Sequence, residues 1–219
     1  VSHELRTPLT SIVGFSRLLA AGDVDAALEG EVLQRIAANA AEMEVMVEQL
    51  LDFSSLEAGQ KTVHIEPVDV VAAAASAVDR LAHHLSGHET KLETPDRLIA
   101  LADTEGLGHV LRNLLTNAAK YSDAGTTITI RADLDGDRVL VTVQDEGAGI
   151  APDVRERVFE RFYRAPDAAH AGRRGSGVGL NVVKRYTELM GGAVSVESEV
   201  GRGSTFTISL RAEVSTAKP

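Results

Sequence analysis

A histidine stands beside a carboxylate near the start of the 219-residue chain, at His3 and Glu4. A neutral imidazole is a nucleophile, and a carboxylate that accepts the proton of its other ring nitrogen strengthens it. Thr7 follows His3 by four residues, which places both on one helical face, where the hydroxyl could orient a water molecule. Heptad spacing of apolar residues from Val1 to Leu19 predicts such a helix, with His3 opposite the seam. An ordinary surface histidine remains the alternative.

Two glycine-rich stretches could hold a ligand. Asp145 ends an alternating strand and is followed by Gly147 and Gly149, which leave room beside its carboxylate for a flat ligand with an exocyclic amino group. Gly175 to Leu180 opens a predicted helix, whose N-terminal N–H groups could bind phosphate. A dinucleotide-binding fold fits poorly, because Leu180 stands where its third glycine would fall and no strand immediately precedes this loop.

A pair of asparagines, Asn113 and Asn117, lies four residues apart on a predicted helix. Amide oxygens at that spacing can reach one site. Mg²⁺ keeps several waters and takes few protein ligands, so a single asparagine is chemically adequate. Two helix-surface asparagines without a ligand are the alternative.

The N-terminal part should be an antiparallel helical hairpin. We expect a first helix to about Ala20, ended by Gly22, and a second that begins after a cap at Asp23 or Asp25. The apolar face of the second helix is too broad for two helices to cover. A second copy of the hairpin would complete a dimeric four-helix bundle, so we expect a homodimer.

The helical pattern ends at Gly59, which places a first domain, for dimerisation, at 1–58 and a second domain at 59–212. We expect a disordered tail at 213–219. The second domain should be α+β, a mostly antiparallel sheet with helices on one face. Asp103 should cap a helix that runs to about Tyr121, and the turn at 135–137 should join two strands into a β-hairpin. The predicted strands are 65–68, 98–102, 126–134, 138–144, 193–197 and 204–210, and the other predicted helices are 70–85, 152–159 and 180–190.

The composition of the chain limits the kinds of partner and the location that we expect for it. A formal net charge of −10 argues against nucleic acid or an anionic membrane as the main partner. The absence of cysteine excludes disulfides and fits a cytoplasmic location. No apolar run approaches the roughly 20 residues of a membrane span. Because the chain opens inside a helical pattern, we expect it to be the C-terminal part of a longer protein, with any inner-membrane anchor in segments upstream of residue 1.

Together these motifs resemble the catalytic region of bacterial sensor histidine kinases, over nearly the whole chain. Each box of that family has a counterpart in the right order. The phosphoacceptor box resembles 2–8, the N-box 113–120, the first glycine box 145–149, the F-box 158–164, and the remaining glycine boxes 175–179 and 201–205.

The resemblance implies a Bergerat-type α/β sandwich that binds ATP and Mg²⁺, with residues 165–174 as a mobile lid. It implies autophosphorylation of His3, with Glu4 as base, then transfer to an aspartate of a response regulator receiver domain, and phosphatase activity that uses Thr7. The other implied site residues are Asn113 for catalysis, Asn117 for Mg²⁺, Asp145 for adenine, Lys120 and Arg164 for phosphates, and Tyr121, Gly147, Gly149, Gly175, Gly177, Gly179, Leu180 and Thr205 around the nucleotide.

Two other functions compete. An ATP hydrolase or ATP-gated clamp on the same fold would carry a glutamate where this chain has Asn113, and an amide is no general base. A scaffold without activity would have lost some of the chemical residues, and none is lost.

His84 and His88 have helical metal spacing, but Gly87 interrupts them and no carboxylate completes a site. Since the chain starts two residues before His3, we expect it to bind ATP well but to dimerise and autophosphorylate poorly.

Overall fold

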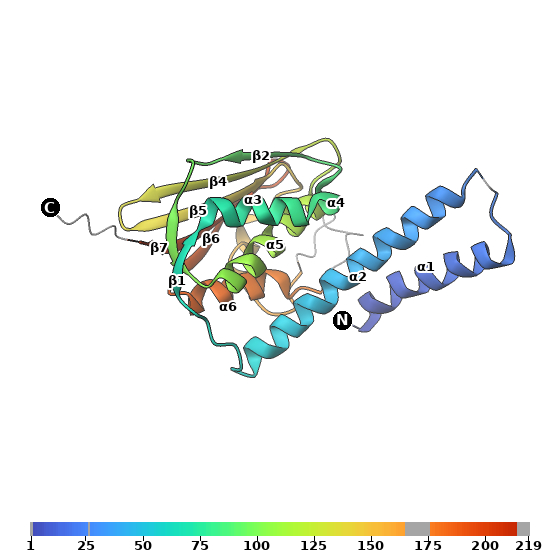
Figure 1. Cartoon of the computed structure of the whole chain (residues 1–219), viewed down its shortest axis with the longest axis horizontal. Helices are drawn as coiled ribbons and strands as arrows, with labels where there is room; N and C mark the ends of the chain where they lie inside the picture. Colours follow the sequence, from blue (N-terminus) through green and yellow to red (C-terminus); the bar gives the residue numbers. More distant parts are fainter. Residues whose placement is uncertain (1, 26, 165–175, 214–219) are drawn as a thin grey trace. The chain divides into compact units, whose positions relative to one another are not determined.

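The computed structural model describes residues 2–25, 27–164 and 176–213, without the side chains of residues 2–4. They form two compact units, one from the first 55 residues with Ser176 and one from the other residues after residue 55 (Figure 1). The first is helical, and the second combines a sheet with helices. None of the helices among the described residues has the length and apolar character needed to cross a membrane.

The first unit is built on two antiparallel helices, α1 (Ser2–Ala21) and α2 (Glu29–Glu57). Gly22 ends α1 as predicted, with φ of 72°, and the N–H groups of Gly22 and Asp23 return to carbonyl oxygens in the last turn, each at 3.1 Å. The predicted cap for α2 was placed too early. Asp25 Oδ1 accepts from Ala27 N at 3.1 Å, so Asp25 stabilises the turn that precedes α2.

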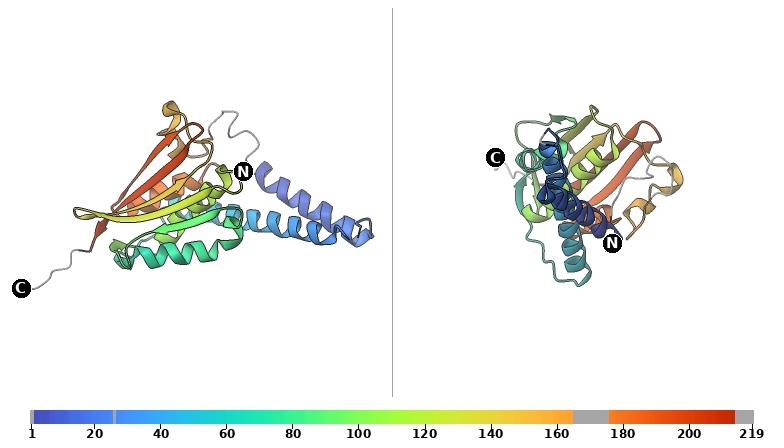
Figure 2. Two further views of the ribbon diagram at one scale, coloured as in Figure 1. Left: turned by 90° about the horizontal axis from the view of Figure 1, so that it is seen from above. Right: turned by 90° about the vertical axis from the view of Figure 1, so that its right-hand side faces the viewer.

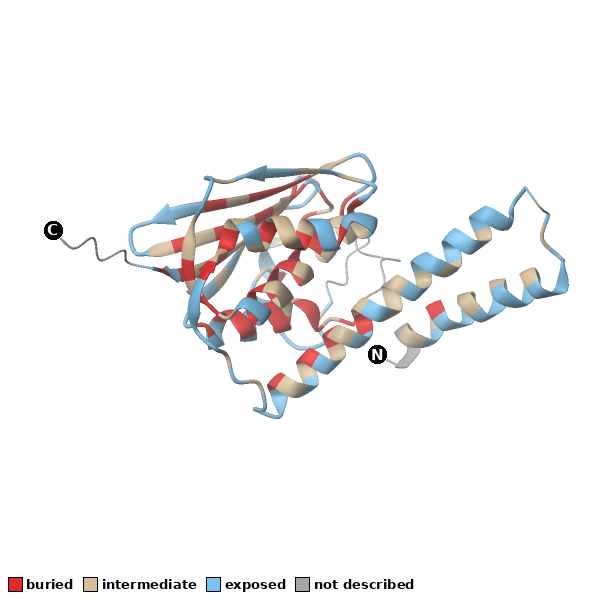
Figure 3. Cartoon of the chain, viewed as in Figure 1, coloured by how far each residue is buried: buried red, intermediate tan, exposed pale blue. Residues whose placement is uncertain are grey.

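Large apolar side chains stay exposed along this hairpin (Figure 3). Leu51 is 63% exposed and Leu33 is 56% exposed. Leaving such side chains in water forgoes about 1.5–3 kcal/mol each relative to burial. The exposed set comprises Leu9, Val13, Leu18, Leu28, Leu33, Val47 and Leu51.

A single open sheet of seven strands organises the second unit, in the order β1-β3-β7-β5-β4-β2, with β6 also paired to β7. Only β2 and β4 pair in parallel among the described strands, so the sheet is mostly antiparallel, as predicted. In β5 every second residue is buried, which is the alternation that identified it. The strands are β1 (Glu66–Asp69), β2 (Glu89–Glu93), β3 (Ile99–Ala102), β4 (Thr127–Asp135), β5 (Arg138–Asp145), β6 (Ala193–Glu199) and β7 (Gly203–Ala212).

Helices pack on one face of this sheet (Figure 2). They are α3 (Val70–Arg80), α4 (Ala82–Leu85), α5 (Thr104–Tyr121) and α6 (Gly179–Leu189). Asp103 caps α5 as predicted, because its carboxylate accepts from Gly106 N at 2.6 Å. The leucines of α5 at 107, 111, 114 and 115 are almost fully buried and form the core with the inward side chains of β4, β5 and β7.

Three local predictions were wrong. The helix expected over 70–85 is two helices, because Leu81 leaves helical geometry (φ −98°, ψ 11°). Strand β2 was missed, since it is a mostly exposed edge strand that carries three charged residues. The stretch 152–159 forms two short 3₁₀ turns in place of one helix, Pro152–Val154 and Arg157–Phe159.

Candidate functional site

Asp145 lies at the end of β5, where the sequence placed it, and only 5% of it is exposed. Its Oδ1 accepts from the backbone N–H of Gly147 at 2.8 Å and from that of Ser204 at 3.2 Å. A buried carboxylate needs such donors, because an unpaired buried charge is costly. The carboxyl group is therefore held rigidly at the strand end by the loop that follows it and by β7.

The glycine loop approaches the end of α5 too closely for any side chain. A Cβ on Gly147 would lie 2.4 Å from the carbonyl oxygen of Tyr121 and 2.8 Å from Asp145 Oδ1. Ala148 N donates to that same Tyr121 oxygen at 3.1 Å. At Gly149, which has φ of 70°, a Cβ would lie 2.0 Å from the Glu199 carbonyl oxygen. The glycines allow this close packing beside Asp145, and we call the loop at 147–149 the glycine cradle.

Helix α5 carries the predicted asparagines, but in different environments. Asn113 is 0% exposed, and its Nδ2 donates to the carbonyl oxygen of His109 at 2.8 Å. Asn117, one turn later, is half-buried. Lys120 also is half-buried, and its Nζ lies 5.3 Å from the centroid of the Tyr121 ring. The last turns of α5 therefore bring an amide, an ammonium and an aromatic ring close to the glycine loop.

The F-box segment, 158–164, packs against strand β7 through Phe159. That ring is 9% exposed and makes an edge contact with Phe206 at 6.3 Å between centroids. Phe162 has φ of 59°, which is strained for a residue other than glycine. A Cβ on Gly177 would lie 2.8 Å from the backbone of Phe162, so the second glycine box, 175–179, packs directly on this strained residue through Gly177. Arg164, at the end of the segment, is exposed.

Helix α6 begins at Gly179, with Leu180 in its first turn. Within the described part of the chain, no side chain caps this turn. N–H groups at an uncapped helix start are donors suited to phosphate. Gly175, together with the predicted lid at 165–174, lies outside the described residues.

The turn between β6 and β7 supports the glycine loop from the far side. Gly201 N donates to the carbonyl oxygen of Ala148 at 2.8 Å, and Ile150 N donates to Ser198 Oγ at 2.7 Å. Thr205 pairs with Gln144, next to Asp145 in β5. Sequence reasoning missed Ser198 and Ser204, because nothing local marks a serine that will meet a loop some 50 residues away.

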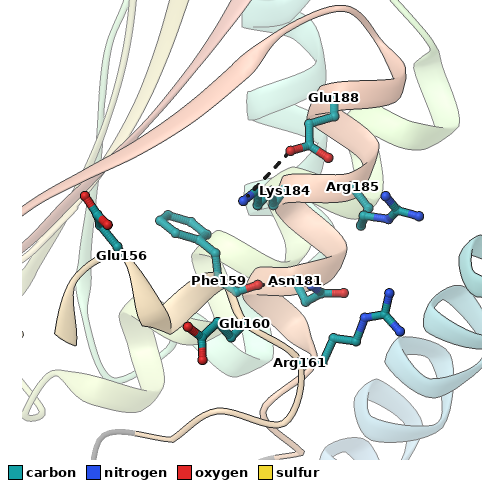
Figure 4. Close-up of a pocket in the computed structure, with 8 residues that line it drawn as sticks. All are labelled: Glu156, Phe159, Glu160, Arg161, Asn181, Lys184, Arg185 and Glu188. Carbon is teal, nitrogen blue, oxygen red and sulfur yellow. Dashed lines mark hydrogen bonds and ion pairs between the residues drawn. The ribbon is translucent and has the colours of Figure 1, made fainter.

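A separate pocket of about 570 Å³ lies between the 3₁₀ turns and α6 (Figure 4). Asn181 Nδ2 donates there to the carbonyl oxygen of Phe159 at 3.0 Å, and Lys184 pairs with Glu188 at 4.0 Å. The pocket does not include Asp145. It is lined by Glu156, Phe159, Glu160, Arg161, Asn181, Lys184, Arg185 and Glu188.

The phosphoacceptor residues belong to the other unit. His3 and Glu4 lie on α1, but their side chains are outside the described part of the structure. Thr7 is half-buried, and its carbonyl oxygen accepts from Ser11 Oγ at 3.2 Å.

Comparison with known proteins identifies both units. The family of histidine kinase-, DNA gyrase B- and HSP90-like ATPases matches residues 102–214, and the His Kinase A phospho-acceptor domain matches residues 1–59. The sensor histidine kinase YcbM of Bacillus subtilis is 32% identical over 96% of this chain, which covers 69% of YcbM. The chain belongs to the sensor histidine kinases.

Other sensor histidine kinases match along the same length. The sensor-like histidine kinase SenX3 of Mycobacterium tuberculosis is 34% identical over 97% of this chain and 52% of its own length. The solved structure of full-length ShkA in complex with AMPPNP superposes with a TM-score of 0.67 at 31% identity, over 97% of this chain and 45% of that one. This sensor histidine kinase chain therefore spans about half the length of several of its relatives and carries their phosphoacceptor and ATP-binding domains.

Proposed function

We propose that the chain is the catalytic region of a kinase that transfers the γ-phosphoryl group of ATP to His3. The observation that carries this proposal is the arrangement around Asp145, a buried carboxylate beside a glycine cradle and the end of α5. It occurs in a chain whose residues 1–59 match a phospho-acceptor domain. The solved ShkA structure contains AMPPNP, an ATP analogue, which supports ATP as the ligand here.

In this proposal Asp145 recognises the adenine ring. Gly147 N and Ser204 N fix its carboxylate, which can then accept a hydrogen bond from the exocyclic amino group of adenine. Because Gly147 and Gly149 carry no side chains, this loop places none between the carboxylate and a flat ring. A carboxylate cannot donate, so guanine, which presents a carbonyl at that position, should be rejected.

In this proposal the last turns of α5 and the start of α6 bind the phosphates. Lys120 and Arg164 supply cations, and the N–H groups of Gly179 and Leu180 point along the helix axis toward its N-terminus. Asn117 would supply a carboxamide oxygen as the protein ligand of Mg²⁺, which when bound would offset charge on the phosphate oxygens. The N-box and the second glycine box would thus hold the two ends of the triphosphate.

In the transfer step a ring nitrogen of His3 bonds to the γ-phosphorus. The bond from that phosphorus to the oxygen that bridges to the β-phosphate breaks, and ADP leaves. Glu4 takes the proton from the other ring nitrogen, while Lys120 stabilises charge on the departing oxygens. In the second step an aspartate oxygen of a receiver domain displaces His3 from the phosphorus, and His3 regains its proton.

We also propose the partners that this activity requires. A receiver domain of a response regulator accepts the phosphoryl group, and Thr7 positions water for its later hydrolysis. A second copy of the chain covers the exposed leucines of the hairpin, such as Leu33 and Leu51. We place the region in the cytoplasm, which the absence of cysteine supports.

Hydrolysis of ATP by water is the competing activity. It needs a general base near the γ-phosphate, and this chain has an amide at the expected position, Asn113. That side chain is fully buried, and its Nδ2 donates to its own helix. The site is therefore better suited to deliver phosphate to a nucleophile of the other unit.

The test is incubation with γ-labelled ATP and Mg²⁺. We expect label on the protein as an acid-labile, alkali-stable adduct, which His3→Gln abolishes while ATP binding survives. His83→Gln is the matched control, since His83 is an exposed histidine in the second unit. Label that persists in His3→Gln would overturn the assignment, and rapid phosphate release without a phosphoprotein would favour hydrolysis.

A further inference from the structure

His88 lies just before β2 and contacts two other segments through its ring. Nε2 is 3.1 Å from the carbonyl oxygen of Ala119, in the last turn of α5. Nδ1 is 3.1 Å from the hydroxyl oxygen of Thr126, which precedes β4. The ring is half-buried, so these contacts are partly shielded from water. No role in the proposed reaction has been assigned to this histidine.

The hydrogen-bond chemistry fixes one proton of the ring. A carbonyl oxygen only accepts, so Nε2 of His88 must carry a hydrogen and donate it to Ala119. The Thr126 hydroxyl has one hydrogen to donate. Either the carbonyl oxygen of Asp123, at 2.7 Å, or Nδ1 of His88 accepts it. In either arrangement the bond from His88 to α5 is a donated hydrogen bond, which a side chain without a donor cannot replace.

The bonded carbonyl is one of the orphan acceptors at a helix end. The last four carbonyl oxygens of an α-helix have no partner within it. In α5 the oxygen of Ala118 accepts from Ser122 N at 3.2 Å and that of Tyr121 accepts from Ala148 N at 3.1 Å. His88 takes the oxygen of Ala119 between them. The end of α5 is therefore capped from three segments, and His88 comes from the most distant one in the sequence.

This helix end carries Asn117, Lys120 and Tyr121 of the proposed nucleotide site. We propose that His88 is a positioning residue for that site, which holds the last turn of α5 in its binding geometry through the Ala119 carbonyl. The inference rests on the proposed function, because it assigns His88 to the same ATP site. Without the bond the turn frays, and only a fraction of molecules presents Lys120 correctly. The apparent affinity for ATP is reduced in proportion to that fraction. At saturating ATP, binding returns the molecules to the competent geometry, so the transfer rate is preserved.

Three variants separate the two ring contacts. Glutamine at position 88 can place an N–H close to the position of Nε2, whereas asparagine reaches only the region of Nδ1. We expect His88→Ala and His88→Asn to raise the dissociation constant for ATP about tenfold and His88→Gln to stay within about threefold of the parent chain. The rate of label transfer at saturating ATP should change less than about twofold in all three. His83→Gln should behave as the parent.

The measurements are titration of each variant with ATP and Mg²⁺, label transfer against ATP concentration, and urea unfolding. Equal affinity of His88→Ala and the parent chain would overturn the inference while leaving the proposed function intact. Equal losses in all three variants that follow their unfolding free energies would overturn it as well, since a purely structural role predicts that pattern. Failure of the parent chain to bind ATP would instead overturn the proposed function.

A measurement on the unaltered chain tests the inference even if the variants do not fold. Nitrogen NMR of the ring should show a proton on Nε2 of His88, because every proton arrangement of the network requires it. A ring with Nε2 unprotonated would contradict the bond to Ala119 and with it the inference.

Discussion

The backbone N–H of Ala148 donates to the carbonyl oxygen of Tyr121 at 3.1 Å, so the loop that follows Asp145 also caps the helix that carries Asn117 and Lys120. Groups proposed for adenine and for phosphate are thereby joined by one backbone hydrogen bond. A change in the loop should consequently affect both ends of the nucleotide.

Gly147→Ala tests that connection. The new Cβ would lie 2.4 Å from Tyr121 O, so the loop or the helix end must move. We expect a loss of about 1–3 kcal/mol in the free energy of unfolding, typical of overpacking, and at least tenfold weaker ATP binding. Gly108→Ala is the control, since nothing lies within 4 Å of its Cβ in α5 and alanine favours the helix by about 0.5–1 kcal/mol. Unchanged ATP affinity in Gly147→Ala would argue that the cradle is not the binding site.

The two asparagines of α5 should separate in their effects. Asn117 is half-buried, so Asn117→Ala should remove most of the Mg²⁺ dependence of ATP binding and leave the unfolding free energy within about 0.5 kcal/mol. Asn113 is fully buried and bonded to His109 O, so Asn113→Ala should cost about 1–3 kcal/mol of stability. Calorimetric titration of ATP with and without Mg²⁺, with urea unfolding, measures both. Mg²⁺ dependence that survives in Asn117→Ala would remove it as the ligand.

Thr7→Ala should separate the two activities at the phosphoacceptor. Loss of the hydroxyl leaves nothing to orient water, so dephosphorylation of a phosphorylated receiver domain should fall at least tenfold, while label transfer to His3 stays within about twofold. Thr10→Ala is a matched control on α1, where Thr10 Oγ1 donates to Arg6 O at 2.8 Å. Equal losses of both activities in Thr7→Ala would indicate a general change in α1.

Local signals sufficed for most elements of the fold. The Asp103 cap, the glycine at position 22 and the turn at Asp135 to Asp137 each act within a few residues, and the structure confirms the helix ends and the hairpin that they predict. Strand β2 was missed because its parallel partner β4 lies 38 residues on, and no local pattern encodes that pairing.

The candidate site likewise combines features that local sequence predicts with contacts that form only between distant segments. The strand-end position of Asp145 and the glycine spacing were readable in the sequence, because they follow from alternation and turn chemistry. The bonds that hold the carboxylate and cap α5 come from Ser204, Ala148 and His88, which meet their partners only in the folded sheet. Sequence reasoning considered His88 only for metal spacing, whereas its ring nitrogens face Thr126 and Ala119.

Lys61 and Glu105 form an ion pair at 3.0 Å that ties the start of the second unit to α5. The hydrogen bond from Lys61, with another from His109, lowers the pKa of Glu105 below its ordinary 4.5. The hydrogen bond to Glu105 raises the pKa of Lys61 above 10.5. Glu105 therefore stabilises the fold above about pH 4.5 and loses this effect as pH falls through its lowered pKa. Lys61 stabilises below about pH 10.5 and loses this effect at higher pH.

Between these limits the pair contributes a constant but small amount, because Glu105 is 71% exposed and water screens the charges. We expect Lys61→Gln to lower the free energy of unfolding by about 0.2–0.5 kcal/mol at pH 7. That difference should vanish once the pH falls below the lowered pKa of Glu105, because the carboxyl group is then protonated. Urea unfolding at pH 7 and at a series of acidic pH values, in a double-mutant cycle with Glu105→Gln, isolates the pair from the His109 contact. A coupling energy that does not decline as the pH is lowered would show that packing, and not charge, links the two residues.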